Sequence, residues 1–302
     1  SNKSINIFSI NGRDVTIIDG NSTNRIMSIT NNDNKIVRLE GFTVQNGDAL
    51  TNSGNIINAT SGTSYFKDMI LQNNGQNTGN GLFKGNGYSY TTFENCIVRN
   101  NGAENAAGIG YATVKNCLVY GNSGWNNTNP INQCIVINST IVDNGGGSGN
   151  AWTTGGATDS QITNSIIRGN GGAGQIYYYG APVLSGVSYS NISGGYSGTG
   201  NIDSDPLFDS VYGLQSNSPC IDTGHPDLDG DGVDYTTDTD DQDPDGTRLD
   251  MGAYYYQQDY PGPTFYVSTS GLDGTGLGNA GNPFATIQAG IDAANNGDTV
   301  VV

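Results

Sequence analysis

The chain has 302 residues and a net charge of −17; 34% of its residues are hydrophobic and 13% are charged. Globular enzymes usually contain about half apolar and about a quarter charged residues, so this composition, with its 46 glycines, argues against an ordinary enzyme core and for a repetitive β architecture with many turns. The scarcity of Lys and Arg argues against nucleic acid or an anionic membrane surface as a partner. No apolar stretch reaches the roughly 18 residues of a transmembrane helix.

Strand-like apolar runs begin early, at residues 15–18, and recur through the first 200 residues, which argues against disorder. One short pattern recurs six times: an apolar residue, a polar one, a turn-prone one, three mostly apolar residues, a polar residue and Asn. Two copies carry one extra Gly before the Asn. The copies begin at Leu39, Phe66, Phe93, Val114, Ile137 and Ile162, and they end at Asn46, Asn73, Asn100, Asn122, Asn144 and Asn170.

The copies start 21 to 27 residues apart. This period is too short for a helical-pair repeat and fits one turn of a right-handed parallel β-helix with three short strands. Leucine-rich repeats have similar lengths, but their Leu-dominated pattern is missing. The sequence therefore predicts an all-β solenoid.

Equivalent positions of a β-helix stack along its axis. We expect the six Asn residues to form a ladder, because Asn tolerates the left-handed backbone of a tight corner and stacked amides bond to one another. The six apolar residues that begin the copies should form a core column. Charged residues at the second position alternate in sign, which predicts a stabilising ladder on one outer face; these are Glu40, Lys67, Glu94 and Lys115.

Four cysteines are present, at positions 96, 117, 134 and 220. None has the spacing of metal ligands. Cys96 and Cys117 occupy equivalent repeat positions, and stacked strands lie about 4.8 Å apart. Two interpretations follow: a disulfide between adjacent rungs, or a column of small buried side chains.

The chain divides by composition into a β-helix body at 1–200, an acidic closing region at 201–259, a linker at 260–264 and a final segment at 265–302. The closing region holds 15 of the 28 acidic residues and one basic residue, Arg248. In the final segment a strand precedes a short helix at 283–295 and a second strand begins at Thr299. The helix signals are Asn282 as the cap, Pro283 at the first position, an apolar face of Ile287, Ile291 and Ala294, and Gly297 at the end.

The segments 265–268, 282–289 and 297–300 resemble the start of a pectin-lyase-like β-helix domain, where they supply a capping helix and a first strand. The segments 203–208, 218–224 and 243–254 resemble the end of such domains in large bacterial surface proteins of the Bacteroidota type. The order is inverted, since the start motif follows the end motif, and residues 4–7 and 15–21 resemble rungs that normally follow the capping helix.

The inverted order predicts a chain that begins inside one β-helix and ends inside the next. Three explanations fit this order. The chain is one of many tandem repeats in a giant polypeptide, or a separate subunit that completes its neighbour, or a fragment chosen for convenience. The first two give a head-to-tail fibre. We therefore expect an extracellular or cell-surface repeat of a filament or adhesin, whose partners are neighbouring copies, with lateral bundling and surface glycans as further partners.

The acidic region contains the strongest chemical signal. Alternating carboxylates around a Gly turn suit Ca²⁺, which takes six to eight oxygen ligands. The pattern resembles calcium loops of dockerin and thrombospondin type 3 repeats, with Asp238 where a Glu is expected at the twelfth position. The predicted ligands of a structural calcium ion are Asp227, Asp229, Asp231, Asp234, Asp238, Asp243 and Asp245. Within the acidic run that follows, Asp240, Asp241, Asp243 and Asp245 either supply a second site or complete the first.

No catalytic residues are predicted. The runner-up function is a carbohydrate-active β-helix enzyme, a polysaccharide lyase or hydrolase, which the family resemblance implies; a glycan-binding module is a third interpretation. The sole histidine, His225, lies beside the acidic loop and is interpreted as a loop residue. Aromatic residues suit either sugar stacking or packing; they include Trp125, Trp152, the run 177–179 and the run 254–256.

Overall fold

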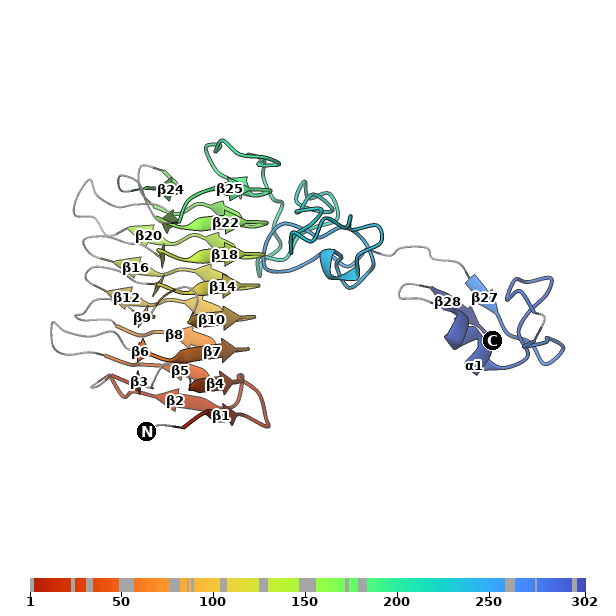
Figure 1. Ribbon diagram of the computed structural model, residues 1–302, viewed down its shortest axis with the longest axis horizontal. Coiled ribbons are helices and arrows are strands. Elements are labelled where there is room, and N and C mark those ends of the chain that lie inside the picture. The colour runs from red at the N-terminus through yellow and green to blue at the C-terminus, as the bar shows by residue number, and fades with distance from the viewer. Residues whose placement is uncertain are drawn as a thin grey trace. The chain divides into compact units, whose positions relative to one another are not determined.

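The computed structural model describes residues 3–22, 25–30, 35–48, 57–75, 82–85, 87, 90–103, 108–124, 130–146, 156–171, 174–178, 184–258, 264–274, 276–294 and 298–302. Its strands stack rung upon rung into a parallel β-helix, from β1 (Ile5–Phe8) to β25 (Val187–Ser188) (Figure 1). The predicted fold class is confirmed. Glu104, Trp125, Trp152, the third residue of the run 177–179, residues 260–263 of the expected linker and Gly297 lie outside the described residues.

Three long sheets form the walls of the β-helix. Sheet 1 has eight strands: β1, β4 (Ile36–Glu40), β7 (Thr63–Lys67), β10 (Thr91–Glu94), β14 (Thr113–Lys115), β18 (Ile135–Ile137), β22 (Gln161–Thr163) and β25. Sheet 2 also has eight: β2 (Ile17–Asp19), β5 (Thr43–Gln45), β8 (Ile70–Gln72), β11 (Ile97–Arg99), β15 (Leu118–Tyr120), β19 (Thr140–Val142), β23 (Ile166–Arg168) and β26 (Asn191–Ile192).

Sheet 3 has seven strands: β3 (Met27–Thr30), β6 (Ile57–Ser61), β9 (Phe83–Lys84), β13 (Ile109–Gly110), β17 (Ile131–Asn132), β21 (Ala157–Thr158) and β24 (Ile176–Tyr177). A short three-stranded sheet consists of β12 (Gly102–Ala103), β16 (Ser123–Gly124) and β20 (Gly145–Gly146). Each of these three strands follows a strand of sheet 2 along the chain. Each chain turn thus passes through sheets 3, 1 and 2 in that order.

The core column of sheet 1 follows the predicted repeat with one correction. Leu39, Phe66, Phe93, Val114 and Ile162 are in one register and buried. In the fifth copy the core residue is Val136 and not Ile137, whose place is in the outward column. The rings of Phe66 and Phe93 stack with centroids 4.7 Å apart, and Phe83 of sheet 3 packs edge-on against both. Such pairs add about 1 kcal/mol beyond burial.

Residues with a positive φ turn the chain at many of the described corners. Asn95 (φ 53°) joins sheets 1 and 2, Asn100 (φ 53°) ends a strand of sheet 2, and Tyr111 (φ 58°) joins sheets 3 and 1. Asn visits this left-handed region more readily than most residues because its short side chain bonds locally. This preference explains why Asn recurs at the left-handed corners.

The six Asn residues predicted to form one ladder belong to two adjacent columns. The strand register separates these columns. The turn column consists of Asn46, Asn73, Asn100, Gly121, Asp143 and Gly169, all with positive φ and all half-buried or exposed. The column one residue later points inward and consists of Asn74, Asn101, Asn122, Asn144 and Asn170, all buried. Gly or Asp replaces Asn in the turn column because that position selects for backbone conformation, whereas the inward column needs the amide.

A third column, at the corner between sheets 1 and 2, holds two of the cysteines. Cys96 and Cys117 are buried and followed on later rungs by Ser139 and Ser165. The backbone N–H of each residue donates to the side chain one rung on: Cys96 to Cys117 Sγ at 3.4 Å, and Cys117 to Ser139 Oγ at 3.1 Å. All four cysteines are free. The interpretation as a buried column is confirmed.

The strand register confirms the alignment on which the predicted charge ladder depends. The register of sheet 1 aligns Glu40 with Lys67, Lys67 with Glu94 and Glu94 with Lys115. Strands lie about 4.8 Å apart, so opposite charges are neighbours along this outer face and attract one another.

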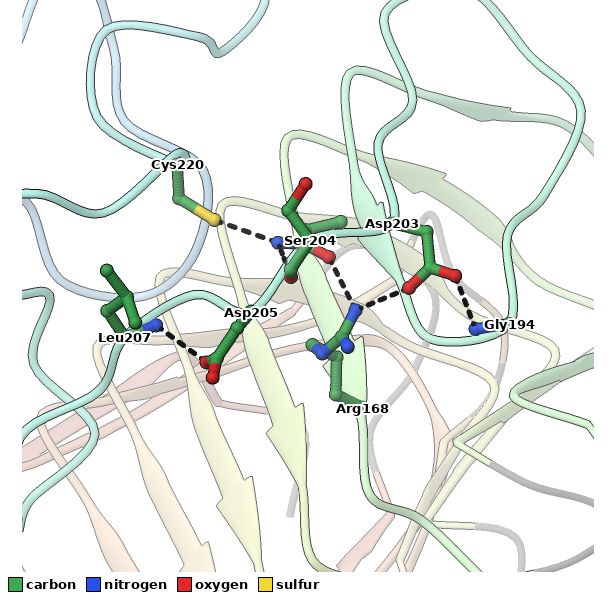
Figure 2. A network of polar contacts seen from close by, with 8 residues as sticks. Arg168, Gly194, Asp203, Ser204, Asp205, Leu207 and Cys220 are labelled. Atoms are coloured by element: carbon green, nitrogen blue, oxygen red, sulfur yellow. Dashed lines mark hydrogen bonds and ion pairs between the residues drawn. The ribbon is translucent and has the colours of Figure 1, made fainter.

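The closing segment 203–225 is fastened to the last rungs by polar contacts (Figure 2). Arg168 Nη1 forms an ion pair with Asp203 Oδ1 at 2.9 Å, and Asp203 Oδ2 accepts the N–H of Gly194. The side-chain amide of Asn191 donates to Ser204 O and to Cys220 Sγ. Asn191 lies in the last strand of sheet 2, so the segment is joined directly to the end of the β-helix.

The described chain divides into two compact units, residues 1–225 with 250–255 and residues 226–249 with 256–302. In the second unit, β27 (Thr264–Tyr266) and β28 (Thr299–Val301) form a parallel pair, as predicted for the strands, and α1 (Ile287–Ala293) connects them. No helix among the described residues is long and apolar enough to span a membrane.

The helix begins later than predicted. Its N-cap is Thr286 and not Asn282; Thr286 Oγ1 accepts the N–H of Ala289 at 3.2 Å. Asn282 instead closes a turn with Asn279, and Phe284 pairs with Val267 as an extended bridge. Pro283 therefore lies in extended chain and not at the first helical position.

Candidate metal centre

Residues 226–249 form a loop built on backbone turns. The N–H of Tyr235 donates to Pro226 O and closes the first part of the loop, residues 226–235. Gly230 and Gly232 have φ of +80° and +86°, which a residue with a side chain rarely adopts. The Asp229 carboxylate accepts the N–H of Asp231 at 3.0 Å. Along these turns the carboxylate of Asp229 lies near those of Asp227 and Asp231.

Five carboxylates meet in two groups that share Asp229. Oxygens of Asp227, Asp229 and Asp241 lie within 4.8 Å of one another, and so do oxygens of Asp229, Asp231 and Asp238. Like charges at such distances repel. The chemistry that this arrangement suits is coordination of a hard cation by oxygen.

Asp241 is the buried member of the cluster. It ends a 3-10 turn, η1 (Thr239–Asp241), whose N-cap is Asp238. Asp241 is 0% exposed. Its Oδ1 accepts the N–H of Leu228 at 2.6 Å, while its Oδ2 has no hydrogen-bond partner. Burying an ionised carboxylate oxygen without a partner is unfavourable.

The pKa values of the cluster respond to the crowding. Burial, together with the charges of Asp229, Asp227 and Asp240, raises the pKa of Asp241. Hydrogen bonding to Asp240, some burial and nearby charge raise the pKa of Asp238 to about 6. Both shifts have the sign expected where negative charge is not compensated.

The predicted ligands divide into two sets. Asp227, Asp229, Asp231 and Asp238 are brought together. The other three lie outside these groups: Asp234 accepts hydrogen bonds from Thr236, Asp245 from Thr247 and Gln258, and the Asp243 backbone bonds to Thr247 and Gly246.

Asp241 was predicted only as a supplementary carboxylate. The run 238–241 contains three Asp residues, and nothing in their order marks the third as the buried one. That choice depends on the 3-10 turn, which directs Asp241 inward.

The histidine and the tyrosine runs are further candidate functional residues. The N–H of His225 donates to Asn164 Oδ1, and its ring packs 4.4 Å from the ring of Tyr189. The hydroxyl of Tyr178 donates to Ser160 O. Tyr177 and Tyr255 are exposed.

The fold defines the class: the chain is a parallel β-helix protein. Comparison with protein-family models, with curated proteins and with solved structures finds no match to this chain. The resemblance to pectin-lyase-like domains and to surface proteins of the Bacteroidota type therefore stays a prediction.

Proposed function

We propose that this chain is a structural unit of an extracellular filament or surface adhesin whose copies join head to tail. The C-terminal segment 264–302 of one copy would cover the first rung of the next. The extracellular setting is suggested by the resemblance of the closing and capping motifs to large bacterial surface β-helix proteins. The observation that carries the function is the uncovered apolar core at the first rung.

The core column of sheet 1 changes abruptly at its first strand. Ile7 is aligned with Leu39 in the register of β1 and β4. Ile7 is 47% exposed, whereas Leu39 is 2% exposed. Among the described residues, β1 and β2 are the outermost strands of their sheets, so each has one edge with no described strand beside it. Solenoids need a cap at such ends, because an exposed apolar face and open strand edges favour association.

The segment 264–302 has the features of a suitable cap. Ile287 and Ile291 lie one turn apart on α1 and are 52% and 54% exposed. The opposite side of α1 packs on its own strands through Gly290, where an added Cβ would lie 2.8 Å from Val300. An apolar helix face is therefore available for a second apolar surface.

The two surfaces also differ in charge. Five of the eleven Lys and Arg residues lie in the first 38 positions, together with three Asp. The segment 264–302 contains three Asp and no Lys or Arg. Complementary charge favours the encounter of the C-terminal segment with the first rung over contacts between identical ends.

Sedimentation velocity over a range of concentrations tests this function. The wild-type chain should form a series of oligomers that grows with concentration. Ile7→Asp on the first rung and Ile291→Asp on α1 should each give monomers. Val211→Asp is a matched control, since Val211 is 65% exposed in the closing segment, and should associate like the wild type.

Mixing the two variants sharpens the test. Each variant retains one intact end, so an equimolar mixture should form heterodimers but no longer oligomers. A wild-type chain that stays monomeric, or association that neither substitution affects, would contradict the head-to-tail function.

A further inference from the structure

We infer that Asp227, Asp229 and Asp241 bind a calcium ion, with Asp231 and Asp238 extending the same coordination sphere. This site is independent of whether copies of the chain associate.

The partnerless oxygen of Asp241 points to a ligand. Its Oδ2 is buried and lacks a hydrogen bond, yet this carboxylate lies within 4.8 Å of those of Asp227 and Asp229. Water or a hydrogen-bond donor normally satisfies such an atom. A cation held among the three carboxylates satisfies it and removes their mutual repulsion.

The distances fit the size of calcium. Calcium binds oxygens at 2.3–2.6 Å, so two oxygens on one ion lie at most about 5 Å apart. The separations within both groups, up to 4.8 Å, meet this limit. The two groups share Asp229, which allows one ion to draw ligands from both.

The order of the ligands matches a twelve-residue calcium loop. In such loops positions 1, 3, 5 and 12 supply side chains, and position 6 is Gly. Here Asp227, Asp229, Asp231 and Asp238 are at positions 1, 3, 5 and 12, and Gly232 is at position 6. Asp238 is one methylene shorter than the usual Glu at position 12. Asp241 supplies a further carboxylate from the turn that follows, which compensates for this shorter reach.

The donor set favours calcium over other metals. All five side chains in the two groups are carboxylates. Zinc prefers nitrogen and sulfur ligands. Magnesium keeps several waters and usually binds one or two protein carboxylates, whereas calcium accepts six to eight oxygens in flexible geometry. We therefore expect calcium to bind at least tenfold more tightly than magnesium.

Isothermal titration of the full chain with CaCl₂, after removal of metal with chelating resin, tests the site. Wild-type protein should bind calcium, and its melting temperature should rise when calcium is added. Asp241→Asn should weaken binding at least tenfold. Asp234→Asn is the control within the loop, because Asp234 is engaged by Thr236, and should bind within about threefold of wild type.

A second readout separates ligation from a purely structural role. Without metal, Asp241→Asn should raise the stability of the loop 226–249 in hydrogen exchange, since it removes a buried charge next to Asp227 and Asp229. With calcium, it should lower that stability relative to wild type. Absence of calcium binding at millimolar concentration, wild-type affinity in Asp241→Asn, or destabilisation by this variant under both conditions would overturn the site.

Discussion

The side-chain amide of Asn122 donates from Nδ2 to Oδ1 of Asn144, 2.9 Å away on the next rung. The same Nδ2 also donates to the backbone oxygens of Val98 and Tyr120, and Asn122 Oδ1 accepts the backbone and side-chain N–H groups of Asn101. One buried amide therefore satisfies polar groups on three rungs. The inward Asn column replaces the β-ladder at a corner where regular pairing stops.

Replacing Asn122 with Ala should strongly destabilise the β-helix. The backbone and side-chain N–H groups of Asn101 lose their acceptor, and the backbone oxygens of Val98 and Tyr120 each lose a donor. Each buried group left unsatisfied costs about 1–3 kcal/mol. We expect a loss of at least about 3 kcal/mol in the free energy of unfolding, measured by urea denaturation. Asn73→Gly is the control, because Asn73 is an exposed turn residue with φ 55° and Gly adopts this conformation freely. Equal losses in both variants would contradict the separation of the two columns.

The sequence predicts the solenoid because period, core pattern and corner residues agree with one another. It does not predict the register at the fifth copy, where counting back from Asn144 selects Ile137 in place of Val136. Adjacent Asn residues, such as Asn73 and Asn74, conceal that the turn and the ladder are different positions. Only hydrogen bonding between rungs distinguishes them, and that depends on strands far apart in the chain.

The site and the cap show the same limit. Alternating carboxylates predict the loop, but the 3-10 turn that buries Asp241 involves contacts with Leu228, thirteen residues away. The helix start was misplaced at Asn282 because local cap signals do not include Asp273, whose carboxylate accepts the N–H groups of Ala285 and Thr286. In both cases contacts between residues far apart in the sequence determine the local structure, and a local sequence pattern does not contain them.

The thiols should be unreactive in the folded chain. Burial raises the pKa of Cys134 to about 12, and burial with the neighbouring Cys96 raises the pKa of Cys117 well above its usual range. A raised pKa keeps the group as a neutral thiol at pH 8, and the thiolate is the reactive form. A chromogenic disulfide reagent should therefore modify these thiols only after unfolding.

Counting the thiols also tests the redox state. Denaturation in guanidinium without reductant should release all four thiols. Release of two would reveal a disulfide, and rapid modification of the folded chain would contradict the burial of Cys117 and Cys134. Burial raises the pKa of Cys220 as well, so this thiol should also react only after unfolding.

The stability of the metal-free acidic loop should fall as pH rises through about 6. The folded pKa of Asp238 is about 6 and that of Asp241 is also raised, against a reference of 3.8. The folded loop then holds protons that the unfolded chain releases, so this contribution is complete below about pH 4 and is lost above the folded pKa. Hydrogen exchange of residues 226–249 at pH 5 and pH 7.5, after chelation, measures the change.

Calcium should reverse this dependence. The ion requires ionised carboxylates, so protons compete with it and binding should weaken below about pH 6. Asp238→Asn should flatten the metal-free profile, because it removes the carboxyl that hydrogen-bonds to Asp240 and lies near Asp231. Asp205→Asn serves as a control, since Asp205 accepts the N–H of Leu207 and belongs to neither carboxylate group. Greater protection of the metal-free loop at pH 7.5 than at pH 5 would show that the carboxylates do not repel one another as the geometry indicates.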